Sequence, residues 1–446
     1  MRQSSSAADL IVRLKAKQVT IGVIGLGYVG LPICIAAGEA GLRIIGFDID
    51  PEKPQAIAKG LSYFKHIAGE RIRRLVDNGV LAATSDFGRL PEADALLICV
   101  PTPLTGELEP DLSFVVSTGE AIAQHLRRGQ LIVLESTTYP GTTRDVLRPI
   151  LETSGLRCDQ DFFLAFSPER EDPGNSQYST ADIPKVVGAD CDEALEAAAA
   201  LYGHFVTQIV EVRSSATAEA VKLTENIFRA VNIALVNELK VIYESMNIDV
   251  WEVIEAAKTK PFGFMPFYPG PGLGGHCIPI DPFYLAWKAR KCGLDARFVE
   301  LAGQINSNMP AHVIDKVAQA VTVRAGKRLD EAQILVLGIA YKKNIDDTRE
   351  SPGLRIIELL EARGAEVDYY DPYVPVIPVT REHKVLAGRR SREWKPAEFG
   401  AYDALLIVTD HDAVDYREAV RNASLIVDTR NVCRRAGLSS TRIVQA

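Results

Sequence analysis

The chain has 446 residues, of which 47% are hydrophobic and 24% are charged, and its formal net charge is −8. This is the composition of a soluble globular protein, and its length exceeds what one hydrophobic core usually serves, so we expect two or three domains. The acidic balance argues against nucleic acid or an anionic membrane as the main partner, while local phosphate binding stays open.

The seven cysteines are scattered, form no CxxC pair and are odd in number. This pattern predicts a cytoplasmic protein without a disulfide framework and without a metal site. Basic residues before the apolar run at Val19 resemble a signal peptide, but the glycines in that run disfavour a continuous helix. Every other apolar window of membrane-spanning length contains charges, so we expect no membrane span.

The first strong pattern is a dinucleotide-binding motif. A β-branched run at Val19–Ile24 leads into GLGYVG at Gly25–Gly30, followed by a predicted helix to Ala40 and a strand at Arg43–Asp50 that contains Asp48. Strand, glycine turn, helix and acid in this order are strong evidence for a dinucleotide site. The alternative is a glycine-rich turn that binds nothing.

Each residue type of this motif has a physical role. Gly25 permits the tight turn, Gly27 lets a pyrophosphate approach the backbone, and Gly30 allows the helix and strand to pack closely. The helix N-terminus offers N–H groups to the phosphates. Asp48 would accept hydrogen bonds from ribose hydroxyls and repel a 2′-phosphate, which favours NAD over NADP.

Polar residues directly follow three further predicted strands, at Asp94–Val100, Leu131–Glu135 and Phe163–Phe166. Thr102, Thr137 and Glu169 therefore stand where open α/β sheets bind ligands. Taken alone, any one of the three could instead cap a loop.

The segment Ser214–Glu244 contains no glycine or proline and carries apolar residues at helical spacing, which predicts one long helix between domains. Lys222 and Asn226 are one turn apart and share a face of this helix. Lys222 could equally be an ordinary solvated lysine. Further helices are predicted at Val250–Lys258 and Phe283–Lys291.

Between these two helices lies the loop Gly270–Asp281, which reads GPGLGGHCIPID. Glycine and proline exclude a regular helix or strand here. A shaped loop around one thiol suits a reactive cysteine that a ligand approaches closely. Taken alone, Cys277 suits a buried cysteine in a tight turn at least as well.

The last third of the chain repeats the first. Strand-like runs at Ile334–Gly338, Val367–Tyr370, Tyr402–Val408 and Ser424–Asp428 echo those of the first domain. The first turn reads GIAYKKN and gains Lys342, so the copy could bind a different phosphate ligand or none. The predicted fold is α/β, with two Rossmann-like doubly wound domains joined by a long central helix and a helical middle domain, at 1–205, 206–325 and 326–446.

Together these motifs resemble those of the nucleotide-sugar 6-dehydrogenases, in order and over essentially the whole chain. The matching segments are GLGYVG, the PTP around Thr102, the EST around Thr137, the Pro-Glu turn at Glu169, KLTEN at 222–226, GGHCIPID at 274–281 and DDTRES around Arg349. The segments at 260–285 and 167–174 look most like the UDP-N-acetylglucosamine branch. UDP-glucose enzymes usually carry PEFLAEG where Arg170 and Pro173 stand here. UDP-N-acetylmannosamine and UDP-glucose remain the alternative substrates.

The resemblance implies an NAD-dependent, four-electron oxidation of the sugar 6-hydroxymethyl group to a carboxylate. Cys277 would attack the intermediate aldehyde and then carry a thioester. Lys222 and Asn226 would stabilise the oxyanion. Water held by Asp281, Thr137 or Lys222 would take the first proton, and Glu169, assisted by Asp281, would be the base of thioester hydrolysis.

The resemblance also implies binding roles and partners. NAD would be held by Gly25, Gly27, Tyr28, Val29, Gly30, Asp48, Lys53, Thr102, Thr137 and Arg349. The UDP-sugar would be held, in a cleft between the two doubly wound domains, by Glu169, Arg170, Lys222, Asn226, Tyr268, Gly272, Leu273, Gly274 and Lys342. A homodimer or higher homo-oligomer would use the long helix. A two-electron β-hydroxyacid dehydrogenase and an inactive NAD or UDP-sugar sensor are the competing functions.

Overall fold

The computed structural model describes residues 6–64, 67–107, 109–170, 181–275, 280–380 and 382–446. The chain divides into two compact units. The first comprises Met1–Glu225 with Phe283–Leu294, and the second comprises Asn226–Pro282 with Asp295–Ala446. None of the described helices combines the length and the hydropathy needed to span a membrane.

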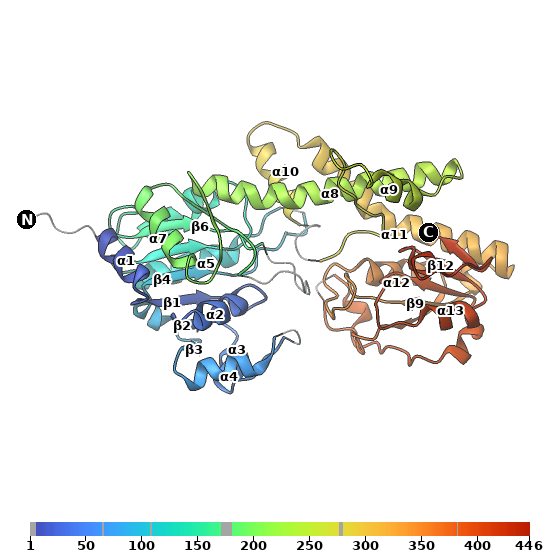
Figure 1. The fold of residues 1–446 in the computed structure, drawn as a ribbon, viewed down its shortest axis with the longest axis horizontal. Helices are drawn as coiled ribbons and strands as arrows, with labels where there is room; N and C mark the ends of the chain where they lie inside the picture. Colours follow the sequence, from blue (N-terminus) through green and yellow to red (C-terminus); the bar gives the residue numbers. More distant parts are fainter. Residues whose placement is uncertain (1–5, 65–66, 108, 171–180, 276–279, 381) are drawn as a thin grey trace, which may run out of the picture. The chain divides into compact units, whose positions relative to one another are not determined.

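The first unit is built on an eight-stranded sheet in the order β3-β2-β1-β4-β5-β6-β7-β8 (Figure 1). The strands are β1 Thr20–Ile24, β2 Arg43–Phe47, β3 Leu81–Thr84, β4 Ala95–Ile98, β5 Leu131–Leu134, β6 Phe163–Phe166, β7 Lys185–Ala189 and β8 Ile209–Val212. Neighbours pair in parallel except β6 and β7, which are antiparallel. The central strands are continuous apolar runs because both faces of the sheet are covered.

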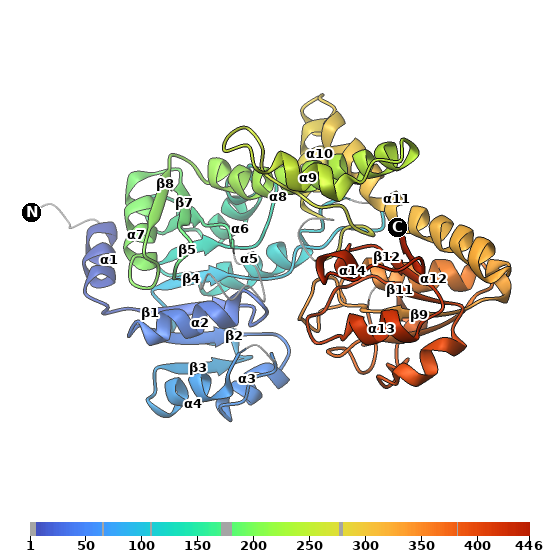
Figure 2. The same cartoon turned by 45° about the vertical axis from the view of Figure 1, so that its right-hand side comes forward.

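The helices of this unit are α1 Ser6–Lys15, α2 Gly30–Glu39, α3 Glu52–Ala58, α4 Gly69–Asp77, α5 Ser113–His125, α6 Arg148–Glu152, α7 Asp192–Tyr202, the start of α8 Ser215–Ser245 and most of α10 Asp281–Lys291. Short 3₁₀ and π turns lie at Phe87–Glu92 and Thr143–Leu147. In Figures 1 and 2, α1 lies beside α7, and Lys15 pairs with Glu196 between them.

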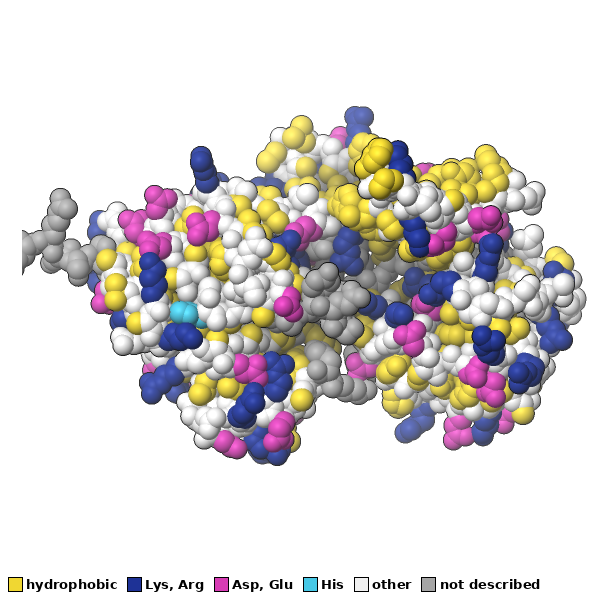
Figure 3. Space-filling model, in the orientation of Figure 1, with side chains coloured by type: hydrophobic (Ala, Val, Ile, Leu, Met, Phe, Trp, Pro, Cys, Tyr) yellow, Lys and Arg dark blue, Asp and Glu magenta, His cyan; other side chains and the backbone are white. Residues whose placement is uncertain are grey.

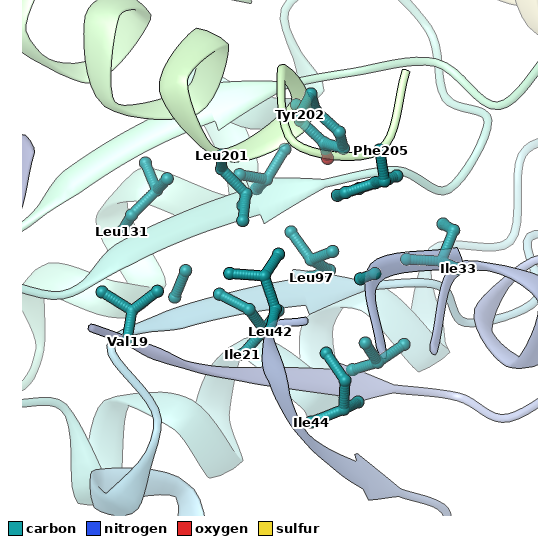
Figure 4. Close-up of a cluster of buried hydrophobic side chains, with 14 of the residues drawn as sticks. Val19, Ile21, Ile33, Leu42, Ile44, Leu97, Leu131, Leu201, Tyr202 and Phe205 are labelled. Carbon is teal, nitrogen blue, oxygen red and sulfur yellow. The ribbon is translucent and has the colours of Figure 1, made fainter. Parts of the chain in front are cut away.

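One core of this unit lies between the sheet and α7 (Figure 4). Strand side chains such as Ile21, Leu97 and Leu131 meet Leu201 and Tyr202 from the end of α7, and all five are buried. Burial of this apolar surface fixes the sheet and so fixes where the loops at its edge begin.

The second unit holds a five-stranded, wholly parallel sheet in the order β10-β9-β11-β12-β13. Its strands are β9 Gln333–Leu337, β10 Glu366–Tyr370, β11 Ala404–Ile407, β12 Ile426–Asp428 and β13 Ile443–Gln445. Its helices are the rest of α8, α9 Val250–Ala257, α11 Arg297–Ala325, α12 Pro352–Ala362, α13 Tyr416–Asn422 and α14 Val432–Arg435, with short 3₁₀ turns at Leu329–Glu331, Lys384–Leu386 and Pro396–Ala401.

The predicted α/β fold, with a Rossmann-like first domain and a second parallel-sheet domain, is confirmed. The predicted long helix is also confirmed, as α8. The 29-residue helix α11 is not among the predicted elements, because Pro310 and a polar stretch around Asn306 interrupt its apolar pattern. It ends at Gly326, whose left-handed backbone (φ 66°) closes the helix.

Candidate active site

The glycine turn between β1 and α2 has the geometry that its sequence predicts. Gly25 has a φ of 92°, and a Cβ on it would lie 2.5 Å from the carbonyl oxygen of Cys99. A Cβ on Gly30 would lie 1.9 Å from the carbonyl oxygen of Gly25, whereas a Cβ on Gly27 would meet nothing within 4 Å. Gly25 and Gly30 are thus required by the turn itself, and Gly27 leaves open space above the backbone.

Asp48 follows β2 and is buried. Its carboxylate accepts hydrogen bonds from the backbone N–H of Leu26 (2.8 Å) and of Asp50 (3.0 Å) and from the amine of Lys53 (2.9 Å). A carboxylate has about four acceptor positions, so capacity for a ribose hydroxyl remains. Open backbone at Gly27 beside an acceptor tied to the same turn fits the pyrophosphate and ribose of NAD.

Three predicted site residues share the carboxyl-end edge of this sheet. Thr102 and Thr137 follow the neighbouring strands β4 and β5, and Glu169 follows β6. Thr102 is buried, and its carbonyl oxygen accepts a hydrogen bond from the hydroxyl of Tyr284 at 2.9 Å. Tyr28, in the glycine turn, packs its ring 4.3 Å from that of Phe64.

Lys222 is buried, and its amine donates to the backbone carbonyl of Glu169. The alternative of an ordinary solvated lysine is therefore wrong. One turn further along α8, Asn226 is buried and donates to the carboxylate of Asp281 at 2.5 Å. Asp281 begins α10. Lys222 and Asn226, on one face of α8, thus bind two segments that contain predicted catalytic residues, Glu169 and Asp281.

Cys277 lies outside the described residues, but the chain on both sides of it is described. On one side, the N–H of Gly275 donates to the carbonyl of Arg349 at 3.1 Å. A Cβ on Gly274 would lie 2.6 Å from Tyr341, so only glycine allows this contact. On the other side, Asp281 is bound by Asn226.

The earlier part of this loop is fixed by two buried asparagines. Asn237 of α8 accepts from the N–H of Gly270 at 3.0 Å and donates to Asn306 of α11 at 2.9 Å. Asn306 in turn donates to the carbonyl of Ala230 at 3.0 Å. Because buried amides need partners, this network explains polar residues inside two packed helices.

The remaining predicted site residues differ in their contacts and in their burial. Arg170 donates to Glu225 and to the carbonyl of Pro184 (2.6 Å), and Arg349 forms a bidentate pair with Asp347. Tyr268 stacks on Trp251 with ring centroids 5.5 Å apart. Half-buried positions are occupied by Val29, Leu273 and Lys342, and Gly272 has a φ of 135°.

Of the predicted site residues, Asn226, Tyr268, Gly272, Leu273, Gly274, Asp281, Lys342 and Arg349 belong to the second unit. The described others belong to the first unit.

The acidic residue that follows the second strand of the second sheet has different hydrogen-bond partners from its counterpart in the first sheet. Asp371 follows β10 as Asp48 follows β2, but its carboxylate accepts from four backbone N–H groups, those of Ile339, Ala340, Tyr373 and Val374. It also accepts from Nε2 of His411 at 3.0 Å. Its acceptor capacity is therefore used internally, and Asp371, unlike Asp48, keeps none for a ribose hydroxyl.

The tautomer of His411 follows from its two contacts. Its Nδ1 accepts from the N–H of Asn344 at 2.9 Å, so the proton is on Nε2, which donates to Asp371. A neutral, fully buried imidazole thus ties the loop after β9 to the loop after β11. These loops lie at the carboxyl-end edge of the sheet, where open α/β domains bind ligands.

Two cationic residues of the second unit are missing from the predicted site. Lys240 of α8 is buried, and its amine has no hydrogen-bond partner among the described residues. Burial, with the nearby charge of Arg430 adding to it, lowers the pKa of Lys240 to about 8. Burial also lowers the pKa of Arg430, which follows β12 and touches Gly270. A buried and a half-buried cation close together suit an anionic ligand. No local sequence pattern predicts that they lie close together.

A glycine turn fitted to NAD and a second parallel-sheet domain without the ribose acid define a nucleotide-dependent oxidoreductase. Three family models match the chain: the NAD binding domain of the UDP-glucose/GDP-mannose dehydrogenase family at residues 19–206, its central domain at 216–308 and its UDP binding domain at 335–435. The chain belongs to the UDP-glucose/GDP-mannose dehydrogenase family.

Individual relatives agree with this assignment. UDP-N-acetyl-D-glucosamine 6-dehydrogenase of Pseudomonas aeruginosa is 34% identical over 89% of this chain and 91% of its own. UDP-N-acetyl-D-mannosamine dehydrogenase of Pyrococcus horikoshii is 35% identical over 93% of this chain and 96% of its own. A solved structure of the latter enzyme superimposes with a TM-score of 0.85 at 34% identity, covering 96% of this chain and 98% of that one. The predicted family and the predicted cofactor, NAD, are confirmed.

Two glycine substitutions distinguish what the folding of the turn requires from what NAD binding requires. We expect Gly27→Ala to keep the melting temperature of the apo protein, because its Cβ meets open space, yet to weaken NAD binding about tenfold or more. Gly30→Ala should instead lower stability by about 1–3 kcal/mol, because its Cβ overlaps the backbone. Thermal melts and NAD titration measure both effects, and NAD binding by Gly27→Ala at wild-type affinity would contradict the fit.

Glu219 of α8 holds the loop that follows Thr137. Its buried carboxylate accepts from the N–H groups of Gly141 (2.5 Å) and Thr143 (2.8 Å) and from the hydroxyl of Thr143 (2.7 Å). Burial raises the pKa of this carboxyl from 4.5 to about 7. The folded chain therefore binds this proton more tightly than the unfolded chain, so the contribution of Glu219 to stability falls as pH rises from about 4.5 through 7.

Glu219→Gln removes this titration. Between pH 5 and pH 8 we expect the unfolding free energy of the wild type to fall by about 2–3 kcal/mol relative to that of the variant. Chemical denaturation at several pH values measures the difference. Glu196→Gln, which changes an exposed carboxylate of the same domain, is the matched control and should show no such trend. A flat difference for Glu219→Gln would show that its carboxyl titrates normally.

Proposed function

We propose that this protein catalyses the NAD-dependent, four-electron oxidation of the C6 hydroxymethyl group of a UDP-sugar to a uronic acid, with UDP-N-acetylglucosamine as the substrate. The observation that carries the proposal is the buried pair Lys222 and Asn226 on one face of α8, bound to Glu169 and Asp281. The choice of sugar rests on the segments at 260–285 and 167–174. The names of the relatives, which include enzymes of UDP-N-acetylglucosamine and UDP-N-acetylmannosamine, support both sugars.

The chain supplies the groups that the chemistry needs. The turn of Gly25–Gly30 and Asp48 would hold NAD, which would supply the hydride acceptor for each of the two oxidations. The hydroxyl proton of the first oxidation would leave to water held by Asp281, Thr137 or Lys222. The thiolate of Cys277 attacks the C6 aldehyde, and after the second oxidation it carries a thioester. Water then attacks the thioester carbon, its proton goes to Glu169, and the C–S bond breaks to return the thiolate.

Lys222 and Asn226 act on the charge that develops at the reacting oxygen. Both are buried and held by hydrogen bonds, so little reorganisation is needed when that charge appears. Such donors contribute on the order of 10²–10³ in rate. The positive charge of Lys222 also favours the thiolate form of Cys277.

The UDP portion meets the second unit. Lys342, in the loop after β9, the buried Lys240 and the half-buried Arg430 supply positive charge for the nucleotide phosphates. Tyr268, Gly272, Leu273 and Gly274 contact the sugar nucleotide from the loop that Asn237 holds. Arg170, bound to Glu225 beside Asn226, orders this turn of α8.

The substrate and the stoichiometry are measured together. Purified enzyme is given UDP-N-acetylglucosamine, UDP-N-acetylmannosamine or UDP-glucose, and NADH is followed by absorbance while product is quantified. We expect turnover of UDP-N-acetylglucosamine with two NADH per product. Fast turnover of another sugar without turnover of this one would overturn the choice of sugar. One NADH per product would favour a two-electron dehydrogenase, and NAD and UDP-sugar binding without turnover would favour a sensor.

The covalent step is tested in the same assay. We expect Cys277→Ser to retain NAD binding but to stop at the aldehyde stage or before it, because an alkoxide leaves far less readily than a thiolate. Cys292→Ser is the matched control, since Cys292 is an exposed free thiol. Full activity of Cys277→Ser would exclude the thioester.

We further propose a homodimer. Apolar side chains are exposed along α8, the 262–268 segment and the start of α11, and Figure 3 shows yellow atoms gathered over this region. The exposed residues are Phe228, Leu235, Val241, Ile242, Met246, Phe262, Phe264, Met265, Tyr268, Phe298 and Leu301. We call this set of exposed apolar side chains the apolar patch, and exposed apolar surface of this kind is typical of a subunit interface.

A charge within that patch tests the dimer. Leu235, on α8, is 48% exposed, and we expect Leu235→Glu to shift the molecular mass measured by light scattering from dimer to monomer. Val379, which is 82% exposed and lies outside the patch, gives the matched control Val379→Glu. A wild-type monomer, or an equal effect of both variants, would contradict the proposal.

The six described cysteines are all free thiols. This supports the cytoplasmic location predicted from their spacing, because a reducing compartment keeps thiols unpaired.

A further inference from the structure

Three charged side chains form a buried cluster at the carboxyl-end edge of the first sheet. The amine of Lys185 lies 2.6 Å from Oε2 of Glu135 and 3.6 Å from Oε2 of Glu169. Their side chains are 8%, 0% and 12% exposed, respectively. The hydroxyl of Tyr202 donates to the other carboxylate oxygen of Glu135.

The reversed strand β7 creates this cluster. Glu135 and Glu169 follow the parallel strands β5 and β6, so both lie at the carboxyl-end edge. Because β7 is antiparallel to β6, with Gly188 opposite Phe166, its first residue, Lys185, lies at that same edge. A parallel β7 would place this lysine at the opposite edge of the sheet.

The cluster holds two carboxylates and one amine in a buried setting. Burial raises the pKa of Glu135, although Lys185 opposes this. The two carboxylates raise the pKa of Lys185 against the effect of its own burial, so the amine stays charged. Both oxygens of Glu135 are occupied by Lys185 and Tyr202, whereas Glu169 is the most exposed member. Glu169 is therefore the member of the cluster that is most accessible to water.

Several other groups near Glu169 bind elsewhere or carry no charge. The amine of Lys222 binds its backbone carbonyl, and Arg170, the next residue, is paired with Glu225. Burial raises the pKa of the Cys99 thiol and of the Tyr202 hydroxyl, so both are neutral at physiological pH. Lys185 and Glu135 are thus two buried charges that act directly on the Glu169 carboxyl.

We propose that Lys185 is a positioning residue that keeps Glu169 ionised as the base of thioester hydrolysis, and that Glu135 sets its basicity. This rests on the proposed function. In the hydrolytic step a water oxygen bonds to the thioester carbon, its proton passes to Glu169, and the electron pair of the C–S bond leaves with the sulfur. The net charge of the cluster then rises from −1 to zero, with Lys185 and Glu135 still paired.

The two partners should have opposite effects. In Lys185→Met, two carboxylates face one another without a cation, so the pair shares one proton at neutral pH and is a poorer acceptor for the proton of the attacking water. In Glu135→Gln, the amine faces Glu169 alone, which makes Glu169 a weaker base that ionises at lower pH. In the double variant Lys185→Met/Glu135→Gln both changes are made, and Glu169 regains a near-normal environment.

The test is the pH profile of kcat for the sugar that the wild type oxidises, together with intact-mass detection of the acyl-enzyme. We expect the acidic limb to move up by about one pH unit or more in Lys185→Met and down in Glu135→Gln, and to return in the double variant. Lys185→Met should also accumulate the acyl-enzyme, with kcat at pH 7 reduced about tenfold or more and KM within about twofold. Lys185→Arg should restore much of the activity.

Lys15→Met is the matched control, because Lys15 forms an exposed pair with Glu196 in the same unit, and it should leave the profile unchanged. Shifts in the same direction for both cluster variants, or a double variant no better than Lys185→Met, would overturn the proposal. If Lys185→Met does not fold, the direction of the Glu135→Gln shift decides. Failure of the proposed function is distinguishable, because the wild type itself would then yield one NADH per product or none.

Discussion

A polar group buried inside a helix must find a hydrogen-bond partner, and α8 meets this requirement by binding loops. Glu219 holds the loop at 141–143, Lys222 holds the carbonyl of Glu169, Asn226 holds Asp281, and Asn237 holds Gly270. These four residues recur at helical spacing along α8. One helix thereby orders the segments that contain the proposed base Glu169, Asp281 and the first glycine of the loop proposed to contact the sugar.

The two sheets, of which the first contains one antiparallel pair, share a pattern of a glycine turn and a following acid. Each has a glycine with positive φ after its first strand and an acid after the second, namely Gly25 with Asp48 and Gly338 with Asp371. Asp48 keeps acceptor capacity for a ribose, whereas His411 and four backbone N–H groups occupy Asp371. The difference arises from the side chain of His411, which lies in the loop after strand β11. A similar fold therefore does not imply a similar ligand.

Features that depend on local sequence were predictable. The glycine turn, the strand ends with Thr102, Thr137 and Glu169, and the uninterrupted helix α8 each follow from a short pattern. The cluster of Glu135, Lys185 and Glu169 was not predictable, because it requires the direction of β7, which hydrophobicity does not encode. The hydrogen bond between Asp371 and His411 and the proximity of Lys240 to Arg430 likewise depend on tertiary contacts between distant segments. Helix α11 was not predicted because Pro310 interrupts its apolar pattern.

The contact of Gly274 and Gly275 with Tyr341 divides one loop into two parts with different freedoms. Before this contact, Tyr268 and Leu273 can change their side chains, whereas Gly270 lies against Arg430 and Gly272 has a positive φ. On the proposed mechanism, sugar preference can thus diverge at these two side chains without disturbing Gly275 and Asp281, the described attachment points on either side of Cys277. Such a division makes the loop evolvable, and it accords with relatives named for different UDP-sugars among chains that share about a third of their residues.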